Sequence, residues 1–283
     1  MTLEVAGAGF KWVDAVNLIG FHDRYAFGSF QVGDVRFPRL LFGTSPFIGA
    51  GQFGGRSMRY YLDFYLNPQN ITRLYLKAIS RGLNAVHILS DPVIVKAIGD
   101  AVRSSKIRSF ILATINVRNL EEELSLCEMV KADSIIIHGS YTDLMEERLS
   151  HILRAVKRKF NDIPTGIATH LPGKVIPRIL KLREVDIILA PINPRGEFME
   201  PNMDSTLRAI SESRRMGKKV LAMKSLAAGK LDPEEAFKYI ADKVDGVTVG
   251  ITSPEELDEV IREARRCFSP NHTDNKADQS SPP

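Results

Sequence analysis

The sequence contains very little cysteine, with only Cys127 and Cys267 among 283 residues. Their number and spacing match neither a disulfide framework nor a zinc cluster. Cys127 falls on the apolar stripe of a predicted helix, which favours a buried thiol. Low cysteine content is typical of proteins from reducing compartments, so we expect a cytoplasmic location.

Long apolar runs are also missing. No stretch of the sequence approaches the about 18 apolar residues that a membrane-spanning helix needs. The first twenty residues, MTLEVAGAGFKWVDAVNLIG, lack the basic start and the long apolar segment of a secretory signal peptide. We therefore expect neither a leader peptide nor a membrane partner.

The sequence lacks a strong excess of either charge. Lysine and arginine total 38 against 34 aspartates and glutamates, which gives a formal net charge of +4. The basic cluster at residues 154–159 falls at the end of a predicted helix, where cations interact favourably with the helix dipole. Neither the net charge nor this cluster indicates a nucleic-acid-binding surface.

What the sequence has is a regular alternation of apolar runs and helical patterns. Hydrophobic residues make up 44% of the chain, enough for a large core. Eight short apolar runs read LLFGTS, NAVHIL, SFILATI, SIIIHG, TGIATH, DIILAPI, KVLAMKS and GVTVGIT. Nearly continuous apolar strands are typical of a parallel sheet that is buried on both faces. Eight βα units in succession predict an α/β fold, a closed (β/α)8 TIM barrel.

Turn and capping signals support this organisation. Gly33-Asp34 lies between two alternating apolar runs and predicts a β-hairpin, which we place across the barrel floor. Residues that can begin helices recur between the strands: Asn70, Asp91, Asn119, Asp143, Asp232 and Ser253. An open doubly wound sheet is the main alternative, but the first strand is not followed by a Gly-x-Gly-x-x-Gly turn.

The domain boundaries follow from the same pattern. Residues 25–268 form the predicted barrel, and residues 1–24 form an N-terminal extension that could hold an extra helix or strand. Residues 269–283 contain almost no apolar side chains, which predicts a disordered tail.

Three of the six histidines fall at the ends of three predicted strands: His87, His138 and His170. Because active sites of TIM barrels lie at the C-terminal ends of the strands, we predict that the three rings point into one pocket as catalytic groups. Imidazole can serve as an acid, a base or a metal ligand near neutral pH. The alternative is that each histidine only closes the top of the barrel. No carboxylate stands at a strand end, so we predict no metal site.

A second predicted site follows the seventh and eighth strands. Lys224 and Ser225 end one strand, and Gly250, Thr252 and Ser253 end the next. Barrels often bind phosphate here, beside a helix N-terminus with unpaired amides. We predict a phosphate-containing ligand bound by these residues together with Asn193, which ends the sixth strand. Lys224 could instead form a Schiff base or pair with an acid.

Two further segments have no assigned chemistry. The glycine-rich FIGAGQFGG after the first strand predicts a tight loop against a ligand or a neighbouring backbone. The aromatic segment RSMRYYLDFYL, residues 56–66, could be a lid over the site or an oligomer contact, although plain packing also accounts for it.

The strand-end segments resemble those of the aldo-keto reductase superfamily over residues 25–268. SIIIHGS is similar to the family's fourth strand, with His138 at the position of its catalytic histidine. DIILAPIN is similar to the sixth strand, with Asn193 at the family's Asn. KVLAMKSLAAGKL and VGITSPEELDEVI resemble the segments that hold the cofactor and its phosphate. The resemblance implies a TIM barrel and a phosphate-containing ligand, whose identity stays open between an NADP-like nucleotide, a flavin-like nucleotide and a phosphorylated substrate.

The sequence departs from the family's catalytic set of Asp, Tyr, Lys and His. His87 stands at the Asp position, Ile115 stands at the Lys position, and the shortened loop that would carry the Tyr has none. Without that proton donor, the resemblance implies that conventional carbonyl reduction is lost.

Three functions for the predicted small-molecule site remain open from the sequence. The first is an enzyme of unassigned reaction that uses the three histidines in acid–base or metal chemistry. The second is a non-catalytic nucleotide-binding or regulatory barrel. The third is a reductase with a replaced proton donor, such as His87.

Overall fold

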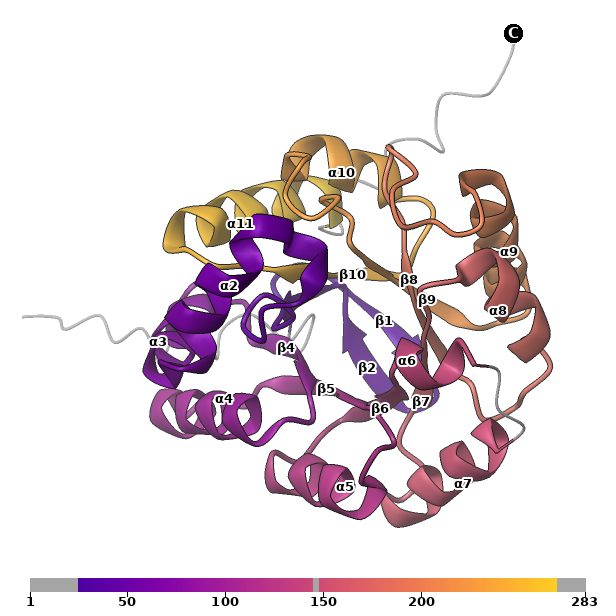
Figure 1. Ribbon diagram of the computed structural model, residues 1–283, viewed down its shortest axis with the longest axis horizontal. Coiled ribbons are helices and arrows are strands. Elements are labelled where there is room, and N and C mark those ends of the chain that lie inside the picture. The colour runs from indigo at the N-terminus through magenta and orange to yellow at the C-terminus, as the bar shows by residue number, and fades with distance from the viewer. Residues whose placement is uncertain (1–24, 145–147, 269–283) are drawn as a thin grey trace, which may run out of the picture.

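A computed structural model describes residues 25–144 and 148–268, and these residues contain a closed barrel of eight parallel strands (Figure 1). The strands follow one another around the barrel in chain order, with β10 closing onto β3. Their bounds are β3 (Leu40–Gly43), β4 (Ala85–Leu89), β5 (Phe110–Ile115), β6 (Ser134–Ile137), β7 (Thr165–Ala168), β8 (Ile187–Pro191), β9 (Lys219–Met223) and β10 (Gly246–Gly250). The predicted TIM barrel is confirmed, and the open sheet is excluded.

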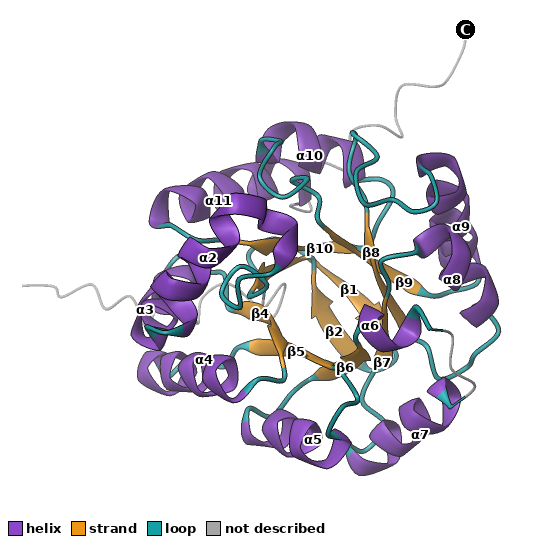
Figure 2. Ribbon diagram, in the orientation of Figure 1, coloured by secondary structure: helices purple, strands orange, loops and turns teal. Residues whose placement is uncertain are grey.

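Helices surround the barrel on its outer side (Figure 2). The longer ones are α3 (Pro68–Ser80), α4 (Pro92–Ser105), α5 (Leu120–Met129), α7 (Leu149–Lys159), α8 (Pro172–Ile179), α9 (Met203–Arg215), α10 (Pro233–Ile240) and α11 (Pro254–Phe268). Short segments lie between strands and helices: η1 (Gly51–Arg56), α2 (Ser57–Tyr60), η2 (Tyr61–Tyr65) and α6 (Gly139–Thr142).

The predicted hairpin is present and joins β1 (Ser29–Val32) to β2 (Val35–Pro38) through Gly33-Asp34. Phe37 is fully buried, and its ring centroid lies 4.5 Å from that of Phe110 on β5. The apolar face of the hairpin packs on the inward-facing side chains of the lower barrel, which include Leu41 and Leu112. The hairpin therefore plugs the N-terminal end of the barrel.

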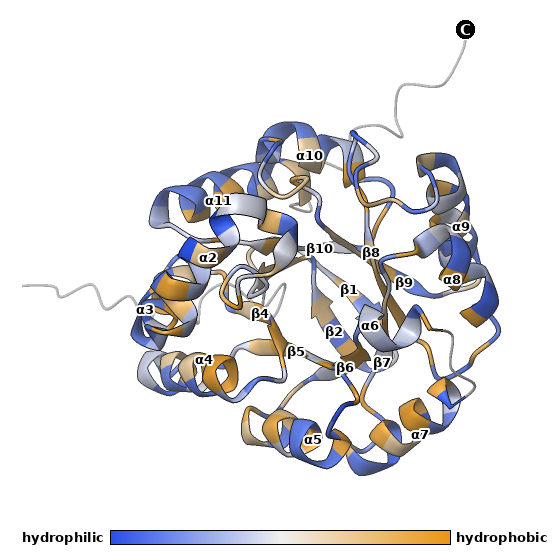
Figure 3. Cartoon of the chain, viewed as in Figure 1, coloured by the Kyte–Doolittle hydropathy of each residue, from blue (hydrophilic) through white to orange (hydrophobic). Residues whose placement is uncertain are grey.

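The main hydrophobic core lies between the strands and the outer helices. Figure 3 shows apolar residues along the strands, while polar and apolar residues alternate along the helices. Each helix buries one face against the barrel, as its sequence period predicts; α3, for example, buries Ile71, Leu74 and Ala78. Cys127 is fully buried in this core, as its position on an apolar stripe predicted.

Four of the six predicted helix starts are confirmed by side-chain caps. Asp91, Asn119 and Asp232 each accept a hydrogen bond from a first-turn amide, and Ser253 accepts one from the amide of Glu256 at the start of α11. The other two predictions are wrong. Helix α3 begins after Asn67, so Asn70 lies inside its first turn and donates its side-chain amide to the carbonyl of Asp63. Asp143 follows the end of α6 and has a different function, given below.

The predicted N-terminal extension, residues 1–24, and the predicted tail, residues 269–283, lie outside the described residues. Within the described part of the chain, no helix has the length and apolar character needed to cross a membrane.

Candidate functional site

A pocket of about 540 Å³ opens at the C-terminal ends of the barrel strands. Every barrel strand contributes a lining residue, either from the strand itself or from the loop that follows it. All three histidines selected from the sequence line this pocket, so the structure brings them together. Their chemical roles depend on what surrounds each ring.

His87 lies deeper in the barrel than its predicted position at a strand end suggested. It occupies the middle of β4 rather than its end, and its ring lies across the barrel interior. Its Nε2 is 2.7 Å from Oγ1 of Thr114, and its Nδ1 is 3.3 Å from Oγ1 of Thr248. Burial, together with the nearby His138, lowers the pKa of His87 to about 4. His87 is therefore a neutral imidazole held at the base of the pocket by two hydroxyl groups.

His138 begins the short helix α6 at the end of β6. Its Nδ1 accepts the backbone N–H of Ser140 at 3.1 Å and lies 2.9 Å from the Ser140 hydroxyl. Burial lowers the pKa of His138 to about 4, and the neighbouring His170 contributes to the change. Because Nδ1 accepts a hydrogen bond, the proton of the neutral ring is on Nε2.

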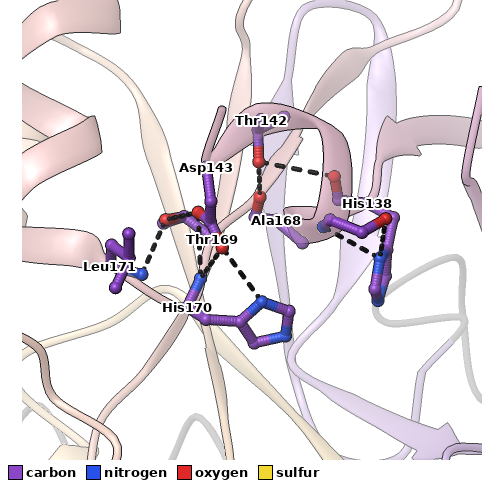
Figure 4. Close-up of polar contacts among 8 residues, drawn as sticks. His138, Thr142, Asp143, Ala168, Thr169, His170 and Leu171 are labelled. Carbon is purple, nitrogen blue, oxygen red and sulfur yellow. Dashed lines mark hydrogen bonds and ion pairs between the residues drawn. The ribbon is translucent and has the colours of Figure 1, made fainter. Parts of the chain in front are cut away.

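His170 follows β7 and is paired with a carboxylate. Oδ2 of Asp143 lies 3.0 Å from Nδ1 of His170, and the Asp143 carboxylate also accepts the backbone N–H of His170 and the hydroxyl of Thr169. Figure 4 shows Asp143 between Thr169 and the His170 ring. Burial acts to raise the pKa of Asp143, but the hydrogen bonds from His170 and Thr169 hold it below its usual value. The carboxylate is therefore ionised and orients the imidazole.

Asp143 was missed as a site residue because the sequence showed it only as a possible helix cap. It stands five residues after His138, in the segment that follows β6 rather than beside β7 in the chain. Helix α6 turns the chain back toward β7, where the Thr142 hydroxyl donates to the carbonyl of Ala168. The signal that could have found it is the pairing of a His at one strand end with an Asp just beyond the neighbouring strand.

The rings of His138 and His170 are neighbours, with centroids 5.4 Å apart and planes at 69°. Within the described residues, no group of three or more His, Cys, Asp and Glu side chains has an arrangement that could hold a metal ion. The arrangement instead resembles an acid–base site, in which neutral imidazoles lie beside a carboxylate-oriented histidine.

Lys224 directly follows β9 and has a left-handed backbone conformation, with φ of 55°. The side-chain amide of Asn193 donates to the carbonyl of Lys224 at 3.3 Å, which fixes this conformation. The Lys224 amine lies 4.7 Å from the centroid of the Phe198 ring. Burial lowers the pKa of Lys224, although the charge of Asp143 acts in the opposite direction. Left-handed non-glycine residues of this kind are enriched at functional sites.

The predicted phosphate site is brought together only in part. Ser225, Gly250 and Thr252 line the pocket together with Lys224, whereas Ser253 and Asn193 are not among its lining residues. Asn193 is fully buried and bonds the backbone groups of its own loop and of Lys224.

A carboxylate already occupies part of that site. Oε2 of Glu256 accepts the backbone N–H of Thr252 at 2.7 Å and its hydroxyl at 2.8 Å. Ser253 caps α11 by accepting the amide of Glu256. Thr252, just before α11, therefore gives its backbone and hydroxyl donors to an internal carboxylate. Ser225 differs: its hydroxyl is buried beside Lys224 and has no hydrogen-bond partner among the described residues.

The segment after β3 covers one side of the pocket. Gln52, Phe53, Arg56 and Tyr60 line it from η1 and α2. The guanidinium of Arg56 donates to the carbonyl of Ala228 in the loop after β9, which links the segment to the rim two strands away around the barrel. Figure 1 shows α2 and η1 at the same end of the barrel as α6. The glycine-rich loop and the start of the aromatic segment thus form part of the pocket wall.

Comparison with solved structures identifies the fold. A putative aldo-keto reductase from Pseudomonas aeruginosa superposes with a TM-score of 0.63 over 85% of this chain and 95% of its own, at 16% identity. The chain has the aldo-keto reductase fold. The holo form of an aldo-keto reductase from Bacillus halodurans gives a TM-score of 0.58 at 13% identity, covering 83% of this chain and 90% of its own.

Further likeness within the same fold comes from a thermostable aldo-keto reductase in complex with the inhibitor epalrestat. It gives a TM-score of 0.59 at 16% identity over 86% of this chain and 96% of its own. No protein-family model matches the sequence, and no curated protein matches it at a significant level. At these identities the likeness establishes an aldo-keto-reductase-like barrel, and the chemistry has to be argued from the pocket.

Proposed function

We propose that this aldo-keto-reductase-like barrel is an enzyme that performs acid–base chemistry on a small molecule bound at the strand ends. The observation that carries the proposal is the pairing of His170 with Asp143 in the wall of the pocket, at 3.0 Å. An imidazole held through Nδ1 by a carboxylate presents Nε2 to a ligand, and this is the arrangement of a general base.

The other two histidines complement this pair. His138 is a neutral imidazole whose protonated Nε2 can donate to a developing negative charge. His87 is also neutral and is fixed by Thr114 and Thr248 at the base of the pocket, where it can orient the ligand. One carboxylate-oriented base beside one neutral donor is the combination that proton abstraction and return require.

The test is a panel of small aldehydes, ketones, lactones and sugar phosphates incubated with the protein in D₂O and followed by proton NMR. We expect at least one compound to be converted or to exchange a proton for deuterium. His170→Gln and Asp143→Asn are expected to slow that reaction by about 10²- to 10⁴-fold, the usual contribution of a positioned general base.

His151→Gln is the matched control, because His151 is an exposed histidine on α7 outside the pocket. Its reaction rate should equal that of the wild type. If no compound reacts, or if His170→Gln reacts at the wild-type rate, the proposed function is wrong.

A second candidate function is binding of a phosphate-containing ligand such as NADP, with or without turnover. The buried Ser225 hydroxyl favours it, because an unpaired buried hydroxyl beside a lysine is satisfied by a bound oxygen. Calorimetric titration with NADP, NADPH and inorganic phosphate tests this candidate. Binding that Ser225→Ala weakens by about tenfold or more would support it, since a hydrogen bond to a charged group is worth about 1.5–3 kcal/mol.

A further inference from the structure

The amine of Lys224 is a partly buried cationic group with no ion-pair partner in the part of the chain that the structure describes. Lys157, which is also partly buried, has such a partner and lies 2.6 Å from Asp186. The Lys224 amine instead lies over the Phe198 ring in a pocket whose nearby wall includes Ala168, Leu189 and Met223. An amine in such a place has two uses, to hold an anion or to attack an electrophile.

The charges of the pocket decide between these uses. The cationic side chains that line it are Arg56 and Lys224, and the carboxylates that line it are Asp232, Glu256 and Glu259. Two positive and three negative charges leave a formal balance of −1, which does not favour a phosphate or another polyanion. Arg56 is also engaged with the carbonyl of Ala228. A neutral ligand fits this balance better than an anionic one.

The backbone of Lys224 adds an independent observation. A lysine with φ of 55° is held against its own preference, here by Asn193 and by the amide of Ala227, which donates to the Lys224 carbonyl at 2.9 Å. Such strain persists where the surrounding structure fixes it, and it fixes the direction of the side chain. Lys224 is also close enough to His138 to lower the pKa of that imidazole.

We propose that Lys224 is a nucleophile that forms a Schiff base with a neutral aldehyde or ketone in this pocket. The lone pair of the neutral Lys224 amine attacks the carbonyl carbon and forms the C–N bond. The carbonyl oxygen takes up one proton from the attacking nitrogen and one from solvent, which the neutral His138 ring can relay, and leaves as water when the C–O bond breaks. The resulting iminium withdraws electrons from the adjacent carbon, and the proton lost there passes to His170. No oxidant or reductant is needed.

Only the proton transfer to His170 rests on the proposed function, because imine formation does not require His170.

The surrounding charges also set the pH dependence of imine formation at Lys224. Burial lowers the pKa of Lys224 and so favours the free amine, while Asp143 and the Phe198 ring favour the ammonium. His138, whose pKa is lowered in part by the charge of Lys224, is neutral above about pH 4 and does not change its charge at neutral or alkaline pH.

The experiment is reductive trapping. The full-length protein is incubated with glyceraldehyde or dihydroxyacetone and sodium cyanoborohydride, which reduces imines, and the modified lysine is located by peptide mass spectrometry. We expect the adduct to form at Lys224 faster than at any other lysine by about tenfold or more, as for a lysine activated by its surroundings. Lys224→Met should abolish it.

Lys230→Met is the matched control, because Lys230 is exposed and paired with Glu197 at 2.6 Å. In Lys230→Met, the rate of adduct formation at Lys224 should match that of the wild type. The absence of a preferential adduct at Lys224 with both probes would overturn the inference. Trapping at Lys224 that persists in His170→Gln supports it even if the NMR panel fails. Proton exchange that survives in Lys224→Met, together with no preferential adduct at Lys224 in the wild type, keeps the acid–base function and overturns the Schiff base.

Discussion

A methyl group on Gly139 would lie 2.5 Å from Nδ1 of His170 and 3.2 Å from Oδ2 of Asp143. His170 and Asp143 therefore contact each other beside Gly139, a residue that has no side chain. The space is available because Gly139 is the first residue of α6, directly after His138. Only glycine at this position lets the ring of His170 pack against the helix while its Nδ1 remains on Asp143.

We predict that Gly139→Ala displaces the His170 ring and separates it from Asp143. The reaction found with the panel should slow by about 10²-fold or more, because a misplaced general base loses its alignment. The fold should survive, since the clash is with a ring that is partly exposed at the pocket. NMR of the His170 ring and the reaction rate provide the measurements.

Gly55→Ala is the control for that change. Gly55 has open space around it and no left-handed backbone angle, so a methyl group there meets nothing. An equal loss of rate in Gly55→Ala and Gly139→Ala would mean that the His170–Asp143 contact is not responsible.

The neutral histidines predict a pH dependence of stability. The pKa values of His87 and His138 are about 4, below the ordinary value of 6.5 in an unfolded chain. Between about pH 4 and 6.5 the unfolded state therefore binds more protons than the folded state does. The free energy of unfolding should fall as the pH drops through this range. A tenfold difference in proton affinity between the folded and unfolded states corresponds to about 1.4 kcal/mol, so the expected loss is on the order of several kcal/mol.

Urea denaturation at a series of pH values measures this dependence. His138→Gln should flatten the curve between about pH 4 and 6.5, because one of the two perturbed groups is removed. His151→Gln should leave the slope unchanged, since that side chain is exposed. A stability that is constant across this range would show that the two rings are not held neutral.

Asn193 is predicted to act through Lys224. Asn193→Ala removes two donors and an acceptor that bond the loop after β8 and the Lys224 carbonyl. We expect a destabilisation of about 1–3 kcal/mol, the cost of leaving buried backbone groups unpaired. The rate of reductive trapping at Lys224 should also fall, because the backbone conformation is released.

Asn202→Ala is the control that separates the two expected effects of Asn193→Ala, the loss of stability and the slower trapping at Lys224. Asn202 accepts the amide of Ser205 at the start of α9, so its loss should cost about 1 kcal/mol through the helix cap alone. Trapping at Lys224 should be unaffected. Equal trapping rates in Asn193→Ala and the wild type would contradict a positioning role for Asn193.

Conventional reductase activity is predicted to be absent. Where the aldo-keto reductase resemblance requires a lysine, β5 ends in the fully buried Ile115, and the Asp position is taken by His87. NADPH-dependent reduction of common aldehydes, followed by the absorbance of NADPH, should stay far below the typical turnover of about 1–10³ s⁻¹. Turnover within that range that His138→Ala abolishes would refute this prediction.

The sequence was sufficient to predict the barrel and its hairpin. Eight apolar runs with helical segments between them leave few other ways to bury the strands on both faces, and Gly33-Asp34 fixes a two-residue turn. The convergence of the three histidines followed from the same reasoning, because side chains after parallel strands share one end of the barrel.

The sequence could not give the contacts that define the site. The depth of His87 in the barrel depends on strand register. Its ring bonds to Thr114 on the adjacent strand β5 and to Thr248 on β10, two strands away in the other direction. Asp143 reaches His170 only because α6 turns the chain back, which no local pattern specifies. Glu256 could be expected to complete a capping box, but its contact with Thr252 at the predicted phosphate site depends on the geometry of the loop.

The hairpin below the barrel also affects the order of events in any reaction. Because Phe37 and its neighbours fill the lower barrel, the pocket that the described residues form opens at the other end, at the rim that carries η1 and α2. Ligands that use one pocket opening exchange one after another, so a product has to leave before the next substrate reaches the histidines. If substrate and product share this pocket, we expect the product to inhibit the reaction in competition with the substrate.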